Sequence, residues 1–231
     1  MSAAAQEAAR KRRLARERER RRLNRLHAYE RAALERGFRA IGGIDEVGRG
    51  PLAGPVVAAC VVLAGPLMLR GLDDSKRVKP ALRIELAEVI KERATAWAIG
   101  EASVDEIERL NIYHASLLAM ERALAALPAL PDYLLTDAVR LRCYRGEQLP
   151  VIKGDAKCAS VAAASILAKV HRDRLLVELD RLHPEYGFAD HKGYATAQHI
   201  DALARHGPCA HHRRGFLRVD AALSLFDFEP A

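Results

Sequence analysis

The chain has 231 residues, half of them hydrophobic, and a formal net charge of +7 at pH 7. That length suits one large domain, or one domain with an appendage. No apolar run reaches the roughly 18 residues of a membrane span, and the start of the chain is charged. The four cysteines form no CxxC pair. We therefore expect a cytoplasmic protein with no membrane partner and no disulfide framework.

The positive charge is concentrated at the start of the sequence. Residues 1–39 contain 13 Lys and Arg but only 5 Asp and Glu, whereas the remainder is nearly neutral. Ala, Arg, Glu and Leu favour a helix, so we expect residues 1–38 to be a basic helical extension and 39–231 to form the main folded domain. The leucines of the extension are too sparse for a wide core face, which predicts an exposed helix. Three roles stay open for it: a solvated tail, a nucleic-acid-binding arm, or a helix that binds another partner.

Strands and helices alternate in the rest of the chain. The residue patterns predict, in chain order, strands at 40–48 and 55–63, a helix at 79–93, a strand at 95–103, two helical stretches within 103–127, strands at 132–138 and 148–156, a helix at 159–182, a loop at 183–194, and a helix at 195–206. Thr196 is expected to cap the last helix, and Gly207-Pro208 to end it. This mixture indicates an α/β protein.

Acidic residues follow three of the apolar strands. They are Asp45 with Glu46, then Asp137, then Asp155. A charge at the end of a buried strand needs a partner, and a hard divalent cation such as Mg²⁺ suits several carboxylates at once. Two such ions about 4 Å apart activate water and stabilise the leaving oxygen of a phosphodiester. The alternative is that each acid is an ordinary strand-end residue.

Asp45 and Glu46 pose a geometric difficulty. Neighbouring residues on a regular strand point to opposite faces. They can share a site only where the strand ends or bends, which Gly48 and Gly50 would permit.

Long motifs resemble one enzyme family. "DEVGRGPLAG" at 45–54 is similar to the signature of bacterial ribonuclease HII, a type 2 ribonuclease H. Further blocks follow in that family's order, and the resemblance covers about residues 36–220. The blocks are "LDDSKRV", "LNIYHASLLAMERAL", "YLLTDAV", "IKGDAKCASVAAASILAKVHRDR", "HPEYGFADHKGYATAQHIDAL" and "HGPCAHHRRGF".

The resemblance implies a ribonuclease-H-like α/β fold with a central mixed sheet flanked by helices and a C-terminal helical portion, acting as a monomer. It implies an endoribonuclease that hydrolyses the RNA strand of RNA–DNA hybrids and incises duplex DNA 5′ to embedded ribonucleotides. The products carry 3′-hydroxyl and 5′-phosphate ends. Catalysis would use two Mg²⁺ or Mn²⁺ ions.

The resemblance also assigns residues. The metal-binding acids are Asp45, Glu46, Asp137 and Asp155. Asp45 would bridge both ions, Glu46 and Asp137 would each complete one site, and Asp155 would hold the ion that activates water. For the substrate, the resemblance implies that Gly48, Arg49 and Gly50 read the ribose 2′-hydroxyl, that Tyr194 stacks beside the next sugar, and that Ser75 and Lys76 contact phosphates. "TDAV" departs from the "DGN" of some members, so their Asn contacts are not transferred.

Other interpretations stay open. The enzyme could be another nuclease or an integrase of the same fold, or the protein could bind nucleic acid through its arm and have an inert domain. The segment "HGPCAHHRR" lacks a second metal-binding pair and favours a phosphate-facing loop with Arg213 and Arg214 as donors over a zinc site. If the arm binds nucleic acid, deleting residues 1–30 should weaken hybrid binding and flatten its salt dependence.

Overall fold

The computed structural model describes residues 3–217. The chain divides into two compact units. Unit 1 contains Met1–Asp45, Cys60–Ala98 and Leu127–Leu167, and unit 2 contains Glu46–Ala59, Ile99–Ala126 and Ala168–Ala231. No helix within the described residues is long and apolar enough to span a membrane.

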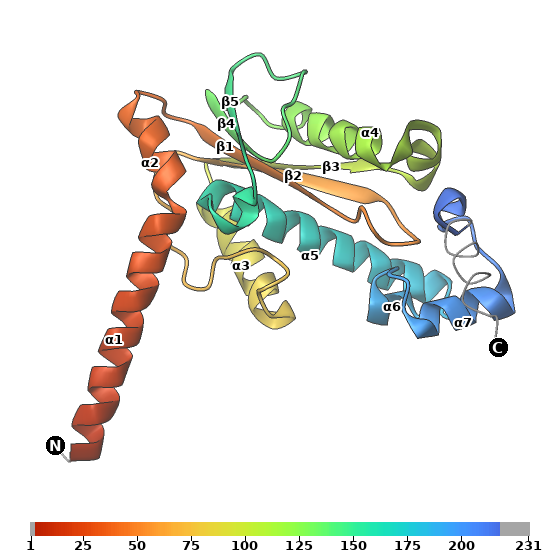
Figure 1. Cartoon of the computed structure of the whole chain (residues 1–231), viewed down its shortest axis with the longest axis horizontal. Helices are drawn as coiled ribbons and strands as arrows, with labels where there is room; N and C mark the ends of the chain where they lie inside the picture. The colour runs from red at the N-terminus through yellow and green to blue at the C-terminus, as the bar shows by residue number, and fades with distance from the viewer. Residues whose placement is uncertain (1–2, 218–231) are drawn as a thin grey trace, which may run out of the picture. The chain divides into compact units, whose positions relative to one another are not determined.

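Five strands form one sheet in the order β3-β2-β1-β4-β5, with helices as the remaining regular elements (Figure 1). The strands are β1 (Ile41–Val47), β2 (Val56–Leu63), β3 (Ala96–Ala102), β4 (Tyr133–Asp137) and β5 (Glu147–Val151). The helices are α1 (Ala3–Leu26), α2 (Ala28–Glu35), α3 (Pro80–Arg93), α4 (Val104–Ala125), α5 (Ala159–Leu182), α6 (Phe188–His191) and α7 (Ala197–His206), with a 3₁₀ turn, η1, at Gly154–Ala156. The α/β prediction is confirmed.

Most predicted elements are present, including the two helical stretches within 103–127. The two helical stretches within 103–127 meet at a kink at Asn111, whose φ is 66° and ψ is 164°. Residues 183–194 were expected to be a loop, but Phe188–His191 form the short helix α6 between left-handed residues at Gly187 and Lys192. As predicted, the Thr196 side chain caps α7 by accepting a hydrogen bond from the His199 amide, and Gly207 ends it with φ 68°.

In unit 1, β4 pairs in parallel with both β1 and β5. The buried strand residues Ile41, Leu135 and Val151 pack with Val161 at the start of α5. Gly43 permits a very close approach, because a Cβ there would lie 2.2 Å from the carbonyl carbon of Ser160. The packing therefore brings the start of α5 directly against β1.

The N-terminal extension is a helix, as predicted, but its C-terminal part is not exposed. Leu23 and Leu26 are buried, and His27, between α1 and α2, is fully buried. The Leu67 amide donates to His27 Nε2 at 2.8 Å, and Glu30 Oε1 accepts from both the amide and the hydroxyl of Ser160 at 2.8 Å. The N-terminal half of α1 extends beyond these contacts (Figure 1). Part of the extension is thus built into unit 1.

Unit 2 has a core of its own around α7 and the end of α5. Leu176, Tyr186, Phe188 and Ala202 pack with Ala53. The rings of Tyr186 and Phe188 stack with centroids 5.3 Å apart. This core supports the glycine-rich segment that follows Glu46.

Candidate active site

The register of β1 and β4 aligns two of the predicted acids. Ile44 pairs with Thr136, and the next residues along the two parallel strands are Asp45 and Asp137. Asp45 is 6% exposed, and Asp137 is half-buried. Since side chains at the same level of adjacent parallel strands are neighbours, the sheet presents these two carboxylates together.

Asp155 reaches the same region from a turn, not from the end of a strand as expected. The strand β5 ends at Val151, and Lys153 adopts a left-handed conformation that starts the 3₁₀ turn η1. The Gly154 amide donates to Asp137 Oδ1 at 2.8 Å. One hydrogen bond therefore ties the turn that carries Asp155 to the carboxylate at the end of β4. We call Asp45, Asp137 and Asp155 the acid cluster.

The charges around Asp155 are mostly negative. Burial raises the pKa of Asp155, and the carboxylates of Asp74 and Asp137 raise it further, while Lys76 opposes them. Sequence reasoning missed Asp74, although the pair Asp73-Asp74 directly before Ser75 was a visible signal. Its Oδ1 accepts from the Lys76 amide at 2.9 Å.

The two predicted phosphate contacts beside Asp74 differ in exposure. Ser75 is 2% exposed, and its hydroxyl oxygen accepts a hydrogen bond from Ser165 Oγ at 2.9 Å. Lys76 is exposed. Of the two side chains, the Lys76 ammonium is therefore the more accessible to a phosphate.

The acid cluster fits a hard divalent cation. Within residues 3–217, no three His, Cys, Asp or Glu side chains are already gathered so as to hold a metal ion by themselves. Mg²⁺ usually keeps several waters and binds through one or two carboxylates together with substrate phosphates. An open group of carboxylates, in which Asp137 and the nearby Asp74 raise the pKa of Asp155, provides such oxygen donors and gains from added positive charge.

In unit 2, Glu46 begins the segment that carries the Gly-Arg-Gly motif. The strand β1 continues through Glu46 to Val47, and Arg49 Nη1 donates to Glu46 Oε1 at 3.1 Å. Gly48 has φ +92° and lies so close to Arg172 that a Cβ would be 2.3 Å from its Nε. A glycine is therefore required here by both the backbone and the packing.

Two buried arginines hold the segment 48–55 by its carbonyl groups. Arg213 is fully buried and donates to the carbonyl oxygens of Gly48, Arg49, Pro51 and Gly54 at 2.6–3.0 Å. Arg172 is also fully buried and donates to those of Ala53, Pro55 and Lys192 at 2.8–3.0 Å. We call residues 48–55 the clamped loop.

The prediction that Arg213 faces phosphate is therefore wrong, because its donors are used inside the protein. Burial and the nearby Arg172 lower the pKa of Arg213 to about 9, so it is charged at neutral pH. Arg214 is exposed.

Tyr194 lies beside the clamped loop. The Leu52 amide donates to the Gly193 carbonyl at 2.8 Å, and a Cβ on Gly50 would lie 3.9 Å from Tyr194 Cε1. The tyrosine is 41% exposed. The predicted sugar-stacking residue and the predicted 2′-hydroxyl-reading glycines are thus neighbours in unit 2.

Comparison with known proteins identifies the family of the chain. The family model described as Ribonuclease HII matches residues 42–219. The ribonuclease HII of Moorella thermoacetica is 54% identical over 198 residues, which are 86% of this chain and 96% of that protein. The enzyme of Geobacillus thermodenitrificans is 51% identical over 206 residues, 89% of this chain and 79% of that one.

Solved structures show the same fold. The ribonuclease H2 of Pyrococcus horikoshii superposes with a TM-score of 0.67 at 24% identity, covering 82% of this chain and all of that one. The RNase HII of Archaeoglobus fulgidus, solved in complex with PCNA, gives 0.63 at 27% identity, covering 76% and 94%. With the family model matching most of the sequence, the chain belongs to the ribonuclease HII family.

Proposed function

We propose that Asp45, Glu46, Asp137 and Asp155 bind two divalent ions, Mg²⁺ or Mn²⁺, at which the phosphodiester is hydrolysed. As a ribonuclease HII, the chain is a metal-dependent endoribonuclease that hydrolyses the RNA strand of RNA–DNA hybrids. It also incises duplex DNA 5′ to embedded ribonucleotides and leaves 3′-hydroxyl and 5′-phosphate ends. The alignment of Asp45 with Asp137, and the bond from Asp137 to the turn of Asp155, is the observation that carries the proposed site.

The chain's own groups set up the acid cluster before any ion binds. Bound divalent ions lower the pKa of a water molecule and stabilise the oxygen that leaves. The Gly154 amide occupies one oxygen of Asp137 and fixes the orientation of that carboxylate. Ala138, the next residue, has φ 57°, a strained conformation for alanine that turns the chain sharply after the acid. The carboxylates are thus positioned by backbone geometry.

Recognition of the ribose is assigned to the clamped loop. A 2′-hydroxyl is both a donor and an acceptor, and only backbone without side chains can approach it closely from either side. Gly48 and Gly50 offer such backbone on either side of Arg49, and Arg213 holds the carbonyls of Gly48 and Arg49 in place. Tyr194, beside Gly50, would stack on the adjoining sugar. Ser75 and Lys76 remain the proposed phosphate contacts on the side of the acid cluster.

The test uses a DNA duplex with one ribonucleotide in Mg²⁺ or Mn²⁺. Asp45→Asn keeps the size of the side chain but removes its charge, and it should lower kcat/KM by at least about 100-fold. It should also weaken Mn²⁺ binding measured by calorimetry without substrate. The exposed Asp201 supplies the matched control, Asp201→Asn. Wild-type cleavage by the Asp45 variant would refute the metal role.

The remaining expectations are also proposals. We place the catalytic domain at residues 39–231, with 1–38 as its extension, and we expect a monomer acting in the cytoplasm on hybrids and on ribonucleotide-containing DNA. Light scattering of the full chain distinguishes a monomer from a dimer. Mapping the cut sites on both substrates in each metal shows which ion and which substrate the enzyme prefers.

A further inference from the structure

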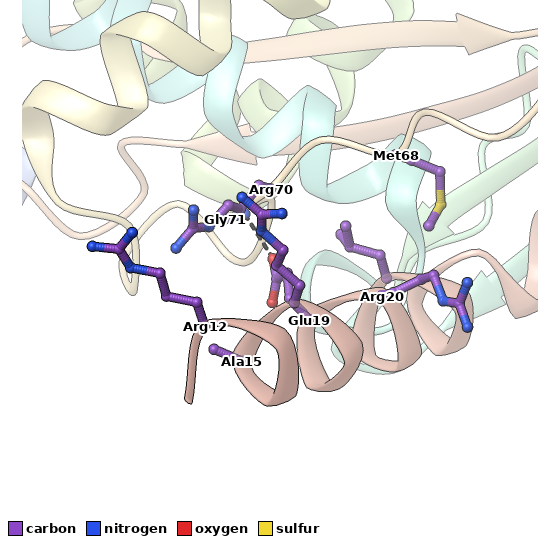
Figure 2. A pocket seen from close by; sticks show the side chains of 9 residues that line it. Arg12, Ala15, Glu19, Arg20, Met68, Arg70 and Gly71 are labelled. Atoms are coloured by element: carbon purple, nitrogen blue, oxygen red, sulfur yellow. Dashed lines mark hydrogen bonds between the residues drawn. The ribbon is translucent and has the colours of Figure 1, made fainter. Parts of the chain in front are cut away.

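The helix α1 presents a row of exposed arginines. Arg12, Arg16 and Arg20 recur every four residues and so lie along one side of the helix. Together with Arg70 from the loop before α3, they line an open pocket of about 950 Å³. Figure 2 shows Arg12, Arg20 and Arg70 around the space between α1 and that loop.

The acid in this pocket is already engaged. Glu19 accepts from Arg22 Nε and Nη2 at 2.9 Å and from the Gly71 amide at 2.8 Å. These contacts lower the pKa of Glu19 to about 2. In the part of the chain that the structure describes, no ion pair joins Arg12, Arg16 or Arg20 to an acid. Like charges four residues apart repel on a helix, so the row calls for negative charge from outside the chain.

The C-terminal end of α1 lies beside the turn that carries Asp155. A second pocket, of about 270 Å³, is lined by Arg22, Arg25, Arg77 and Lys157, together with Ala156, the residue after Asp155. Asp73 lies there too, and it pairs with Arg22 at 3.6 Å and with Arg77 at 3.4 Å. Arg25 is exposed. From Arg12 to Arg25 the helix rises about 20 Å. We call Arg12, Arg16, Arg20 and Arg70 the arginine track.

We propose that the arginine track binds the phosphate backbone of the duplex that flanks the cleaved ribonucleotide. Guanidinium groups match phosphate oxygens in geometry and charge. A regular row of them on a helix positions a polyanion without reading its sequence. The proposal rests on the proposed function, because the substrate bound at the acid cluster brings its flanking backbone to the track.

Point substitutions test this better than removal of residues 1–30. That deletion would also remove Leu23, Leu26, His27 and Glu30, which are buried in unit 1, so weaker binding could reflect damage to the fold. The variant R12Q/R16Q/R20Q keeps residues that favour a helix and removes three charges from the track. Circular dichroism confirms that the helix is retained.

The measurement is equilibrium binding of a labelled 30-base-pair DNA duplex with one ribonucleotide, in EDTA, between 50 and 200 mM salt. Each lost phosphate contact reduces the salt slope by about 0.9. Three lost contacts make the affinity change across this range about 40-fold smaller than for the wild type. At 50 mM salt, we expect binding at least about tenfold weaker. This loss of affinity should be smaller on a duplex that ends close to the ribonucleotide, because such a duplex does not reach the arginine track.

The control removes three exposed arginines elsewhere in unit 1, in the variant R93Q/R142Q/R145Q. If both triple variants change the slope equally, only net charge matters and the proposal is overturned. An unchanged slope in R12Q/R16Q/R20Q overturns it as well. Should that variant unfold, R12K/R16K/R20K, which keeps the charge, must retain the wild-type slope. Because EDTA removes divalent ions, binding is measured without cleavage. The result therefore tests the arginine track even if the assignment of the metal-binding acids is wrong.

Discussion

The Nε2 atoms of His199 and His212 lie 3.0 Å apart in the interior of unit 2. The Cys209 amide donates to His212 Nδ1 at 3.0 Å, so His212 carries its proton on Nε2 and donates to His199. His199 Nδ1 in turn donates to the Tyr194 carbonyl at 2.9 Å. A chain of neutral rings therefore connects the residue before Arg213 to the backbone of Tyr194. One end of this pair of rings adjoins Arg213, which holds the carbonyl of Gly48, and the other end holds the backbone of Tyr194.

The buried rings of His199 and His212 predict a loss of stability in mild acid. Burial, and the proximity of His199, lower the pKa of His212 to about 4 from 6.5. Between pH 6.5 and 4 the His212 ring binds a proton in the unfolded chain but stays neutral in the folded protein. The free energy of unfolding therefore falls as the pH falls. The stability that the neutral His212 ring contributes is fully present above pH 6.5, and about 3 kcal/mol of it is lost by pH 4. Urea unfolding at pH 7, 5.5 and 4 measures it.

Two variants isolate the contribution of His212. H212Q removes the titrating ring, so its stability should depend less on pH over this range, although it is less stable at pH 7. H206Q changes an exposed histidine of α7 and should follow the wild type. His199, Cys209, His183 and His211 surround His212 and remain in both variants. If H212Q loses as much stability between pH 7 and 4 as the wild type, the histidine chain is not the acid-sensitive element.

Replacing Arg213 by lysine should release the clamped loop. Lysine carries the same charge, but its single ammonium cannot replace a planar guanidinium that reaches four carbonyl groups. With buried carbonyls left unpaired, we expect R213K to lose about 3 kcal/mol of unfolding free energy. The KM for a single-ribonucleotide duplex should rise as well. R214K, at the exposed neighbour, should match the wild type in both measurements. A stable R213K enzyme with unchanged KM would show that the loop does not depend on this clamp.

The sequence was sufficient to predict most helices and strands and the acidic site residues, but not the long-range contacts that hold them in place. Apolar runs ended by acids identified β1 and β4, because strand period and burial are local signals. The role of Arg213 was not predictable, since its carbonyl partners at 48–54 lie more than 150 residues earlier. The burial of Glu30 escaped prediction because charged residues on an Arg-rich helix normally face water. Long-range contacts of this kind leave no periodic trace in the sequence.

Asp74 should influence metal binding although sequence reasoning did not assign it. Its charge lies close enough to Asp155 to raise the pKa of that carboxyl. Asp74→Asn keeps an oxygen for the Lys76 amide and removes the charge. We expect Mn²⁺ affinity about 10-fold weaker by calorimetry, as for other groups that surround metal ligands. Wild-type affinity in this variant would place Asp74 outside the metal site.

Glu30 predicts a pH dependence of opposite sign. Burial raises its pKa above the 4.5 of an unfolded chain, while Ser160 and His27 oppose the shift. The folded state therefore holds a proton that the unfolded state releases, and stability is lost as the pH rises above 4.5. E30Q keeps an oxygen for Ser160 and does not ionise. Its stability relative to the wild type should improve as the pH rises above 4.5.

The contrasting variant is E30A, which removes both hydrogen bonds to Ser160 and should be about 1–3 kcal/mol less stable than E30Q at every pH. Urea unfolding of the three proteins at pH 4.5, 6 and 8 separates the two effects. A difference between E30Q and the wild type that stays constant with pH would mean that Glu30 does not titrate in this range.

Gly43 should tolerate no side chain, because β1 and the start of α5 meet backbone to backbone there. An added Cβ would lie 2.2 Å from the Ser160 carbonyl carbon and 2.4 Å from the Val161 nitrogen. Backbone atoms of a buried strand and helix cannot both move aside, so we expect G43A to cost at least about 3 kcal/mol. For a chain of this size that lowers the melting temperature by about 6–12 °C. The strand would shift two residues before Asp45, so Mn²⁺ affinity should fall with stability.

The control is G65A, where nothing lies within 4 Å of the added carbon; this variant should melt within about 2 °C of the wild type. Equal melting temperatures for G43A and G65A would contradict the close packing of β1 on α5.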